Sequence, residues 1–312
     1  MADRQSPGQD GRLNKRGDRL TGVACASGAY ALWGLFPLYF KAVAAVPALE
    51  VLAHRIVWSL LVVFVALVLG GGLGAAGAIF RQPRLLAVLA ASAAALTVNW
   101  GVFIYAIDSG QVLQSSLGYF INPLVSILLG VAVLGERLNR LQWLAVALAA
   151  SGVVLEVVTV GSLPWIALAL AFSFAAYGLL RKLAPAEALA GLFAETALLA
   201  PVALAYLLVL AAKGEGTFAA DTIRLDLLLV LAGLVTALPL VLFVAGARRV
   251  RLVTVGLLQY IAPTGHFLLA LFVFGETITL LHGLTFALTW VGLALYTADA
   301  LRGPLRVRRA AA

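Results

Sequence analysis

The chain has 312 residues, of which 63% are hydrophobic and 12% are charged, whereas soluble domains carry roughly 25% charged residues. This composition excludes an ordinary soluble domain, and the single Cys25 excludes both an intramolecular disulfide framework and a thiolate metal cluster. The net charge of +8 does not indicate nucleic-acid binding, because the basic residues lie in short gaps between apolar runs. We therefore predict a membrane protein.

Residues 1–20 are polar and basic, which predicts a cytoplasmic tail before a retained first helix. Spanning about 30 Å of hydrocarbon takes roughly 20 apolar residues, and charges, prolines and glycines divide the next part of the chain into ten such segments. The predicted transmembrane helices cover residues 21–45, 48–70, 84–107, 111–134, 141–160, 164–181, 189–212, 225–247, 253–274 and 278–299. Residues 301–312 form a second basic tail.

The distribution of basic residues orients these helices. With the amino terminus inside, the cytoplasmic regions hold eighteen Lys and Arg residues and the outer regions hold three, which are Lys41, Lys213 and Arg224. Positive residues concentrate on the cytoplasmic side of membrane proteins. The sequence therefore predicts that both termini are cytoplasmic.

The two halves of the chain resemble each other at a shift of 140 residues. Residues 117–136 (LGYFINPLVSILLGVAVLGE) align without a gap on 257–276 (LLQYIAPTGHFLLALFVFGE), with eight identities in twenty positions. Two Leu- and Ala-rich helices can share residues by chance, but the paired Pro and Gly-Glu at fixed spacing favour duplication. Because each half holds five helices, an odd number, the copies have opposite orientation. We predict an all-α membrane protein in which repeats 21–160 and 161–300 surround a central cavity.

Several motifs point to a known family. The segments LWGLFPLYFK (32–41), PALEVLAHRIVWSL (47–60), SLGYFINPLVSILLGVAVLGERL (116–138) and LQYIAPTGHFLLALFVFGE (258–276) resemble the RarD branch of the EamA-type drug/metabolite transporters, over about residues 20–300. The resemblance implies a ten-helix transporter of the bacterial cytoplasmic (inner) membrane that works by alternating access. It implies little about the cargo.

Polar side chains within the spans are the candidates for the cavity, because such residues rarely face lipid. The fourth predicted helix carries Ser115, Tyr119, Asn122 and Ser126 on one face, and the ninth carries Gln259 and His266. Pro123 and Pro263 remove backbone donors and are predicted to kink these two helices. The third helix adds Asn99 and Trp100. Alternatively, these groups bond only between helices, as Ser, Asn and Gln often do in membranes.

Four ionisable residues within the predicted spans are candidates for a role in transport. Arg55 sits about 12 Å from the outer boundary of the second helix, and the shift of 140 relates it to Glu195 of the seventh. Whether these two residues interact is left open by the sequence. His54, His266 and Glu195 are the candidate proton carriers, since histidine titrates near neutral pH. Charged gating or proton coupling through His54, Arg55 and Glu195 is therefore a hypothesis.

The sequence favours a secondary transporter that exports or exchanges a small metabolite, amino acid or drug. A passive facilitator or channel is the alternative. An intramembrane enzyme is a weaker one, because the chain lacks the HExxH, GxSxG and GxxxxGK[ST] motifs. We expect no catalytic residue, metal site, cofactor or nucleic-acid partner. The expected partners are the lipid bilayer, a small-molecule substrate and protons, and the oligomeric state is left open.

Overall fold

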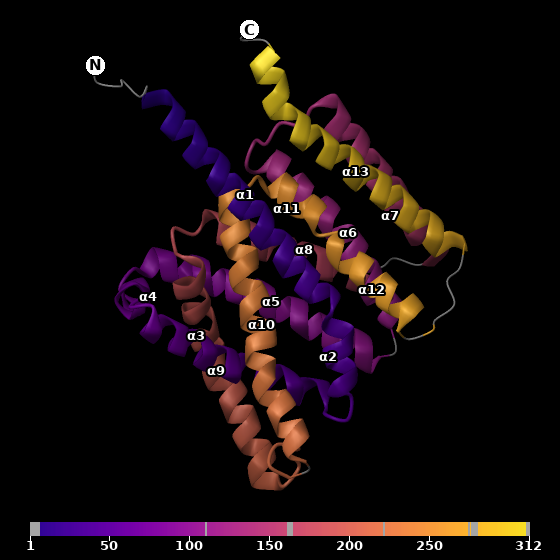
Figure 1. Ribbon diagram of the computed structural model, residues 1–312. Coiled ribbons are helices and arrows are strands. Elements are labelled where there is room, and N and C mark those ends of the chain that lie inside the picture. The colour runs from indigo at the N-terminus through magenta and orange to yellow at the C-terminus, as the bar shows by residue number, and fades with distance from the viewer. Residues whose placement is uncertain are drawn as a thin grey trace.

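The computed structural model describes residues 7–109, 111–160, 165–220, 222–273, 275 and 280–309, and every regular element in these ranges is a helix (Figure 1). The first part of the chain forms α1 (Pro7–Gly34), α2 (Phe36–Ala42), α3 (Ala48–Leu69), α4 (Leu73–Phe80), α5 (Pro83–Asp108), α6 (Val112–Ala132) and α7 (Arg140–Val160). The second part forms α8 (Trp165–Leu183), α9 (Ala188–Lys213), α10 (Ile223–Arg249), α11 (Leu252–Leu258), α12 (Ile261–Phe272) and α13 (Leu280–Arg309).

Seven helical stretches of the described residues are long and apolar enough to cross a membrane, the first spanning Gly17–Ala42 and the last Leu252–Phe272. Three shorter apolar stretches lie in α6, α7 and α13, at Leu117–Ala132, Arg140–Leu155 and Gly283–Tyr296. The prediction of an all-helical membrane protein with many spans is confirmed. The short helix α4 was not among the predicted segments, although it buries Ala76 and Ile79.

Two predicted helices are interrupted, and proline explains both interruptions. The segment 21–45 breaks at Leu35, two residues before Pro37, because Pro37 has no N–H to donate to the Trp33 carbonyl one turn earlier. The segment 253–274 breaks between α11 and α12. Pro263 has no N–H to donate to the Gln259 carbonyl, which accepts instead from the Ala262 N–H at 3.1 Å. In contrast, α6 continues through Pro123.

A glycine turn ends α6. Gly135 has a φ of +64°, a left-handed conformation that glycine adopts without steric cost. Gly275, which the shift of 140 pairs with Gly135, has a φ of +66°. The turn lets the Glu136 N–H donate to the Gly130 carbonyl at 2.9 Å and brings the Glu136 side chain to the start of α11.

The helices pack in pairs that join the two parts of the chain. Extensive contacts link α7 with α13, α6 with α11, and α3 with α9; Figure 1 shows α7 and α13 side by side. Further neighbours are α1 with α10, α5 with α8, α3 with α10, α5 with α9, α6 with α8 and α1 with α12. The largest buried core draws on α1, α3, α4, α5 and the helices from α8 to α12. Within it, Phe243 of α10 contacts Tyr30 of α1 and Tyr177 of α8 at ring-centroid distances of 6.0 and 5.8 Å.

Close helix crossings occur between residues that the 140-residue shift relates. A Cβ added to Gly152 of α7 would lie 3.1 Å from the Thr285 carbonyl oxygen of α13, and a Cβ added to Gly292 of α13 would lie 2.7 Å from the Ala145 carbonyl oxygen of α7. The shift of 140 relates Gly152 to Gly292 and Ala145 to Thr285, so the same contact occurs twice, with the roles of α7 and α13 exchanged. Small residues permit such close approach of helices in membranes.

Candidate functional site

Arg55 lies in the first half of α3 and is half-buried. Its Nε donates a hydrogen bond of 2.9 Å to Thr236 Oγ1 of α10. The guanidinium carbon lies 4.9 Å from the ring centroid of Trp100, 5.7 Å from that of Phe40 and 6.0 Å from that of Phe36. Aromatic faces attract cations at these distances. α2, α3, α5 and α10 therefore hold one guanidinium against three rings.

The rings continue from Arg55 towards α6 and α12. Phe103 lies 6.4 Å from Phe40 and 6.3 Å from Tyr119, and Tyr119 lies 5.6 Å from the His266 ring, all between centroids. His266 Nε2 is 3.0 Å from the Trp33 carbonyl oxygen. We call the set Arg55, Phe36, Phe40, Trp100, Phe103, Tyr119 and His266 the arginine–aromatic cluster. It brings together four of the residues that the sequence proposed and draws on both parts of the chain.

Asn99 precedes Trp100 in α5 but points to a different partner. Its Nδ2 donates to the Leu170 carbonyl oxygen at 2.9 Å and to Ser173 Oγ at 3.1 Å, both in α8. The amide group therefore bonds α5 to α8.

Asn122, Ser126 and Gln259 are buried near the crossing of α6 and α11. Ser126 Oγ donates to Asn122 Oδ1 at 3.5 Å. A Cβ on Gly256 would lie 2.8 Å from the Pro123 carbonyl oxygen, so the two backbones are in close contact there. Gln259 Oε1 is buried without a hydrogen-bond partner among the described residues. The Ser115 side chain lies outside what the structure describes.

His54 faces the connection between α9 and α10. Its Nε2 lies 3.9 Å from Glu50 Oε1, and its Nδ1 accepts from Trp58 Nε1 at 3.2 Å. Glu50 is 1% exposed and accepts from the N–H and the hydroxyl of Thr217 at 2.8 and 2.9 Å. His54 and Glu50 therefore fix this connection to α3, on a different contact set from that of Arg55.

Glu195 does not pair with Arg55. Glu195 Oε1 lies 3.5 Å from Arg181 Nε of α8 and accepts a hydrogen bond from Ser92 of α5. Arg181 is 0% and Glu195 1% exposed, which makes this a fully buried ion pair. The sequence did not identify Arg181, because an Arg-Lys pair at a helix end resembles a cytoplasmic topology signal. A glutamate inside a span nevertheless indicates that a cationic partner lies nearby, because charged residues within membranes usually pair.

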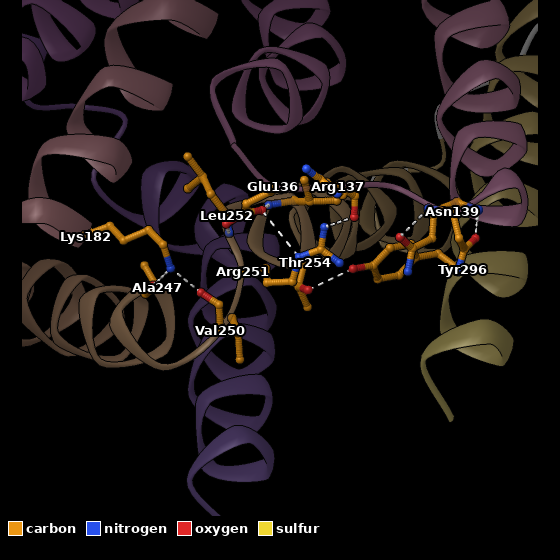
Figure 2. A network of polar contacts seen from close by, with 12 residues as sticks. Glu136, Arg137, Asn139, Lys182, Ala247, Val250, Arg251, Leu252, Thr254 and Tyr296 are labelled. Atoms are coloured by element: carbon orange, nitrogen blue, oxygen red, sulfur yellow. Dashed lines mark hydrogen bonds and ion pairs between the residues drawn. The ribbon is translucent and has the colours of Figure 1, made fainter. Parts of the chain in front are cut away.

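A network of polar contacts lies at the start of α11 (Figure 2). Glu136 accepts from the N–H groups of Leu252 and Val253 at 2.6 and 2.9 Å and lies 3.8 Å from Arg251 Nε. Thr254 and Tyr296 share a hydrogen bond of 2.8 Å. A carboxylate at a helix start neutralises unpaired N–H groups and the positive end of the helix dipole. Glu136 therefore caps α11 from the end of α6.

We expect Glu136→Ala to lower the free energy of unfolding by roughly 1–2 kcal/mol, because the first two N–H groups of α11 lose their acceptor. Thermal melting of the purified protein in detergent measures this change. Glu187→Ala is the matched control, since Glu187 begins α9 without a side-chain capping hydrogen bond. An equal loss in both variants would contradict the capping role.

Other parts of the described residues offer less specific sites. A recess of about 590 Å³ lies between α1, α9 and α10 and is lined by Asp18, Glu187, Arg248 and Arg249 among others. Its lining does not include the arginine–aromatic cluster. Within the part of the chain that the structure describes, no group of three His, Cys, Asp or Glu side chains is placed to hold a metal ion.

Comparison with known proteins assigns the family. The model of the EamA-like transporter family matches residues 20–158. An uncharacterized transporter from Vibrio cholerae is 45% identical, covering 94% of this chain and 97% of its own length. Protein RarD from Escherichia coli is 46% identical, covering 90% of this chain and 95% of its own length. A solved crystal structure with 22% sequence identity superposes with a TM-score of 0.68 over 92% of this chain and 99% of that one, which shows a shared fold. The chain therefore belongs to the EamA-like transporter family as a RarD-type member, and it is a membrane transporter of the drug/metabolite superfamily.

Proposed function

We propose that this protein is a secondary transporter that moves a small organic solute by alternating access through ten transmembrane helices in two inverted repeats, residues 21–160 and 161–300. One observation carries the proposal, and it is the pattern of helix neighbours. Exchange of the two repeats converts the pair α1–α10 into α8–α5, the pair α3–α10 into α9–α5, and the pair α6–α8 into α12–α1, and all six pairs are in contact.

Individual residues support the same relation. In a two-fold arrangement, residues near the axis meet their own counterparts. Tyr260 Oη donates to the Phe120 carbonyl oxygen at 3.3 Å, and these residues are 140 positions apart. The reciprocal contacts of Gly152 and Gly292 and the shared left-handed φ of Gly135 and Gly275 follow the same shift. Inverted repeats of this kind place a substrate site at their interface near the midplane.

The arginine–aromatic cluster is our proposed substrate site. It joins Arg55, Trp100 and Tyr119 of the first repeat to His266 of the second, and Thr236 of the second repeat holds Arg55. The proposed cargo is a small metabolite, amino acid or drug that is exported or exchanged. Asn99, Ser115, Asn122, Ser126 and Gln259 remain candidates for the cavity wall, with bonding between helices as the alternative role.

We further propose a location in the bacterial inner membrane with both termini cytoplasmic. The eighteen-to-three distribution of basic residues supports this orientation. In Figure 1 the start of α1 and the end of α13 lie at the same end of the bundle, as an even number of spans requires. In a Cys25→Ala background, Ala311→Cys should react with an impermeant maleimide only after the inner membrane is opened.

Proton coupling is proposed to use Glu195, with His54 and His266 as further candidates. Glu195 Oε2 is buried and accepts no hydrogen bond from the described residues. A proton could therefore bind this oxygen without displacing a hydrogen-bond donor. Among the described residues, the charged and titratable neighbours of Glu195 are Arg181 and Tyr177, which both lie on α8. An imposed pH gradient across proteoliposomes should therefore change the rate of uptake. Uptake that ignores the gradient would remove this part of the proposal.

Counterflow tests the transport mechanism itself. A thermal-shift screen of the purified protein against metabolite pools identifies a ligand, which is then supplied to proteoliposomes in labelled form. Preloading with unlabelled ligand should accelerate uptake, because a carrier returns faster when it is loaded. Uptake that preloading does not accelerate would favour the passive facilitator or channel.

A further inference from the structure

We propose that the arginine–aromatic cluster binds the carboxylate of a monoanionic organic solute with a flat apolar body, such as an aryl or indolyl acid. This inference names the substrate class of the proposed site and rests on the proposed function. It follows from three features of Arg55 among the described residues, namely its free donor edge, its lack of an acidic partner and its aromatic neighbours.

The hydrogen bond from Nε to Thr236 orients the Arg55 guanidinium, and the edge that carries the two Nη groups remains as a donor. Arg55 Nε donates to Thr236 Oγ1, and no other acceptor of the described residues forms a hydrogen bond with the guanidinium. Arg55 is half-buried, and neither of its Nη groups is a buried nitrogen without a hydrogen-bond partner. Both Nη groups are therefore accessible. A carboxylate binds such a fork with two parallel hydrogen bonds.

No carboxylate of the described residues compensates the charge of Arg55. Three other arginines of the described residues do have an acidic partner: Arg181 pairs with Glu195, Arg249 with Asp18 and Arg251 with Glu136. Arg55 forms no such ion pair within the described part of the chain. A cation within a membrane span costs several kcal/mol when it faces lipid, so its accessible edge is expected to face water or an anion. An anionic ligand would supply the missing charge.

The aromatic neighbours match the rest of the ligand. Trp100, Phe40 and Phe36 surround the guanidinium, and Phe103 and Tyr119 extend the apolar surface away from it. Cation–π contacts contribute about 0.5–2 kcal/mol, which offsets only part of the cost of an unpaired charge in the membrane. The same rings provide stacking surface for a flat apolar body. A charged head and an aromatic surface side by side therefore favour an aryl carboxylate over a sugar or a cation.

The test compares isosteric probes on the purified full-length protein in detergent. The probes are indole-3-acetate and 3-phenylpropionate, their neutral carboxamides, and phenethylammonium. Binding is measured by thermal shift and by microscale thermophoresis. The carboxylates should bind at least about tenfold more tightly than the amides, since a hydrogen bond to a charged group contributes about 1.5–3 kcal/mol. Equal affinity for acid and amide, preference for the ammonium, or no binding of either acid would overturn the inference.

Variants locate the binding to Arg55. Arg55→Gln should reduce carboxylate affinity by roughly tenfold to a hundredfold and leave amide affinity unchanged. Arg55→Lys should recover part of it, because the charge remains but the fork is lost. Arg249→Gln is the matched control, since Arg249 is exposed and pairs with Asp18. Carboxylate affinity that survives in a folded Arg55→Gln protein would overturn the inference. If that variant does not fold, the comparison of acid and amide on the unaltered protein decides.

The two proposals can fail separately. Counterflow of some neutral or cationic solute without carboxylate binding would overturn the anion site and preserve the transporter. Carboxylate binding that depends on Arg55, without uptake or counterflow of the bound acid, would support the site and contradict the proposed transport mechanism.

Discussion

Arg181→Met is expected to lower the free energy of unfolding by about 3–5 kcal/mol, because it leaves the buried Glu195 carboxylate without its cation. Arg181 and Glu195 are almost completely inaccessible, and Gly191 packs so closely that an added Cβ would lie 2.1 Å from Arg181 Nη1. Water therefore has little room to replace the lost charge. Thermal and chemical denaturation in detergent, followed by tryptophan fluorescence, measures the loss.

The double variant Arg181→Met/Glu195→Leu provides the decisive comparison. Removal of both charges is expected to restore most of the stability, because apolar side chains of similar size fill the site without a desolvation cost. Arg249→Met is the control, since the exposed pair between Arg249 and Asp18 contributes at most about 1 kcal/mol. A double variant as unstable as Arg181→Met alone would show that the two charges are not energetically coupled. A double variant that is stable but insensitive to a pH gradient would support proton coupling through Glu195.

Gly233→Val is the second substitution with a large expected effect. A Cβ at Gly233 of α10 would lie 2.4 Å from the Trp58 carbonyl carbon of α3, which is backbone and cannot move aside alone. Ser59 Oγ also donates to the Gly233 carbonyl oxygen at 3.2 Å, so the two helices are bonded at this crossing. Overpacking of a tight interior costs about 1–3 kcal/mol, and more where backbone is the obstacle. We expect a loss of about 3 kcal/mol or more in the free energy of unfolding.

The same substitution should disturb the substrate site. Gly233 is three residues before Thr236, and Trp58 is three residues after Arg55, so separation of α3 from α10 pulls Thr236 Oγ1 away from Arg55 Nε. Carboxylate affinity should therefore fall in whatever fraction of Gly233→Val protein remains folded. Gly283→Val in α13 is the control, because no atom outside its own helix backbone lies within 4 Å of a Cβ there. Equal stability of the two valine variants would contradict the close crossing.

The described helices agree with the sequence prediction where the physics is local. Backbone groups in lipid must bond within their own helix, so a run of about 20 apolar residues is enough to predict a span. The interruption at Leu35 was missed, although Pro37 was visible in the sequence. At Pro263 the sequence predicted a kink, and the structure has a break between α11 and α12. A proline predicts a missing hydrogen bond, but the packing of neighbouring helices decides whether the helix bends or breaks, as the continuous α6 at Pro123 shows.

The sequence by itself determined the apolar segments, the family and the presence of unusual charges at Arg55 and Glu195, because hydrophobicity and motifs are properties of consecutive residues. Only the tertiary structure decided which partner each charge has. Glu195 bonds to Arg181 and Ser92, whereas Arg55 meets Thr236 and three aromatic rings. The physical reason is that an ion pair depends on which faces of distant helices meet at the same depth. That relation is set by the packing of the whole bundle, and no single segment encodes it.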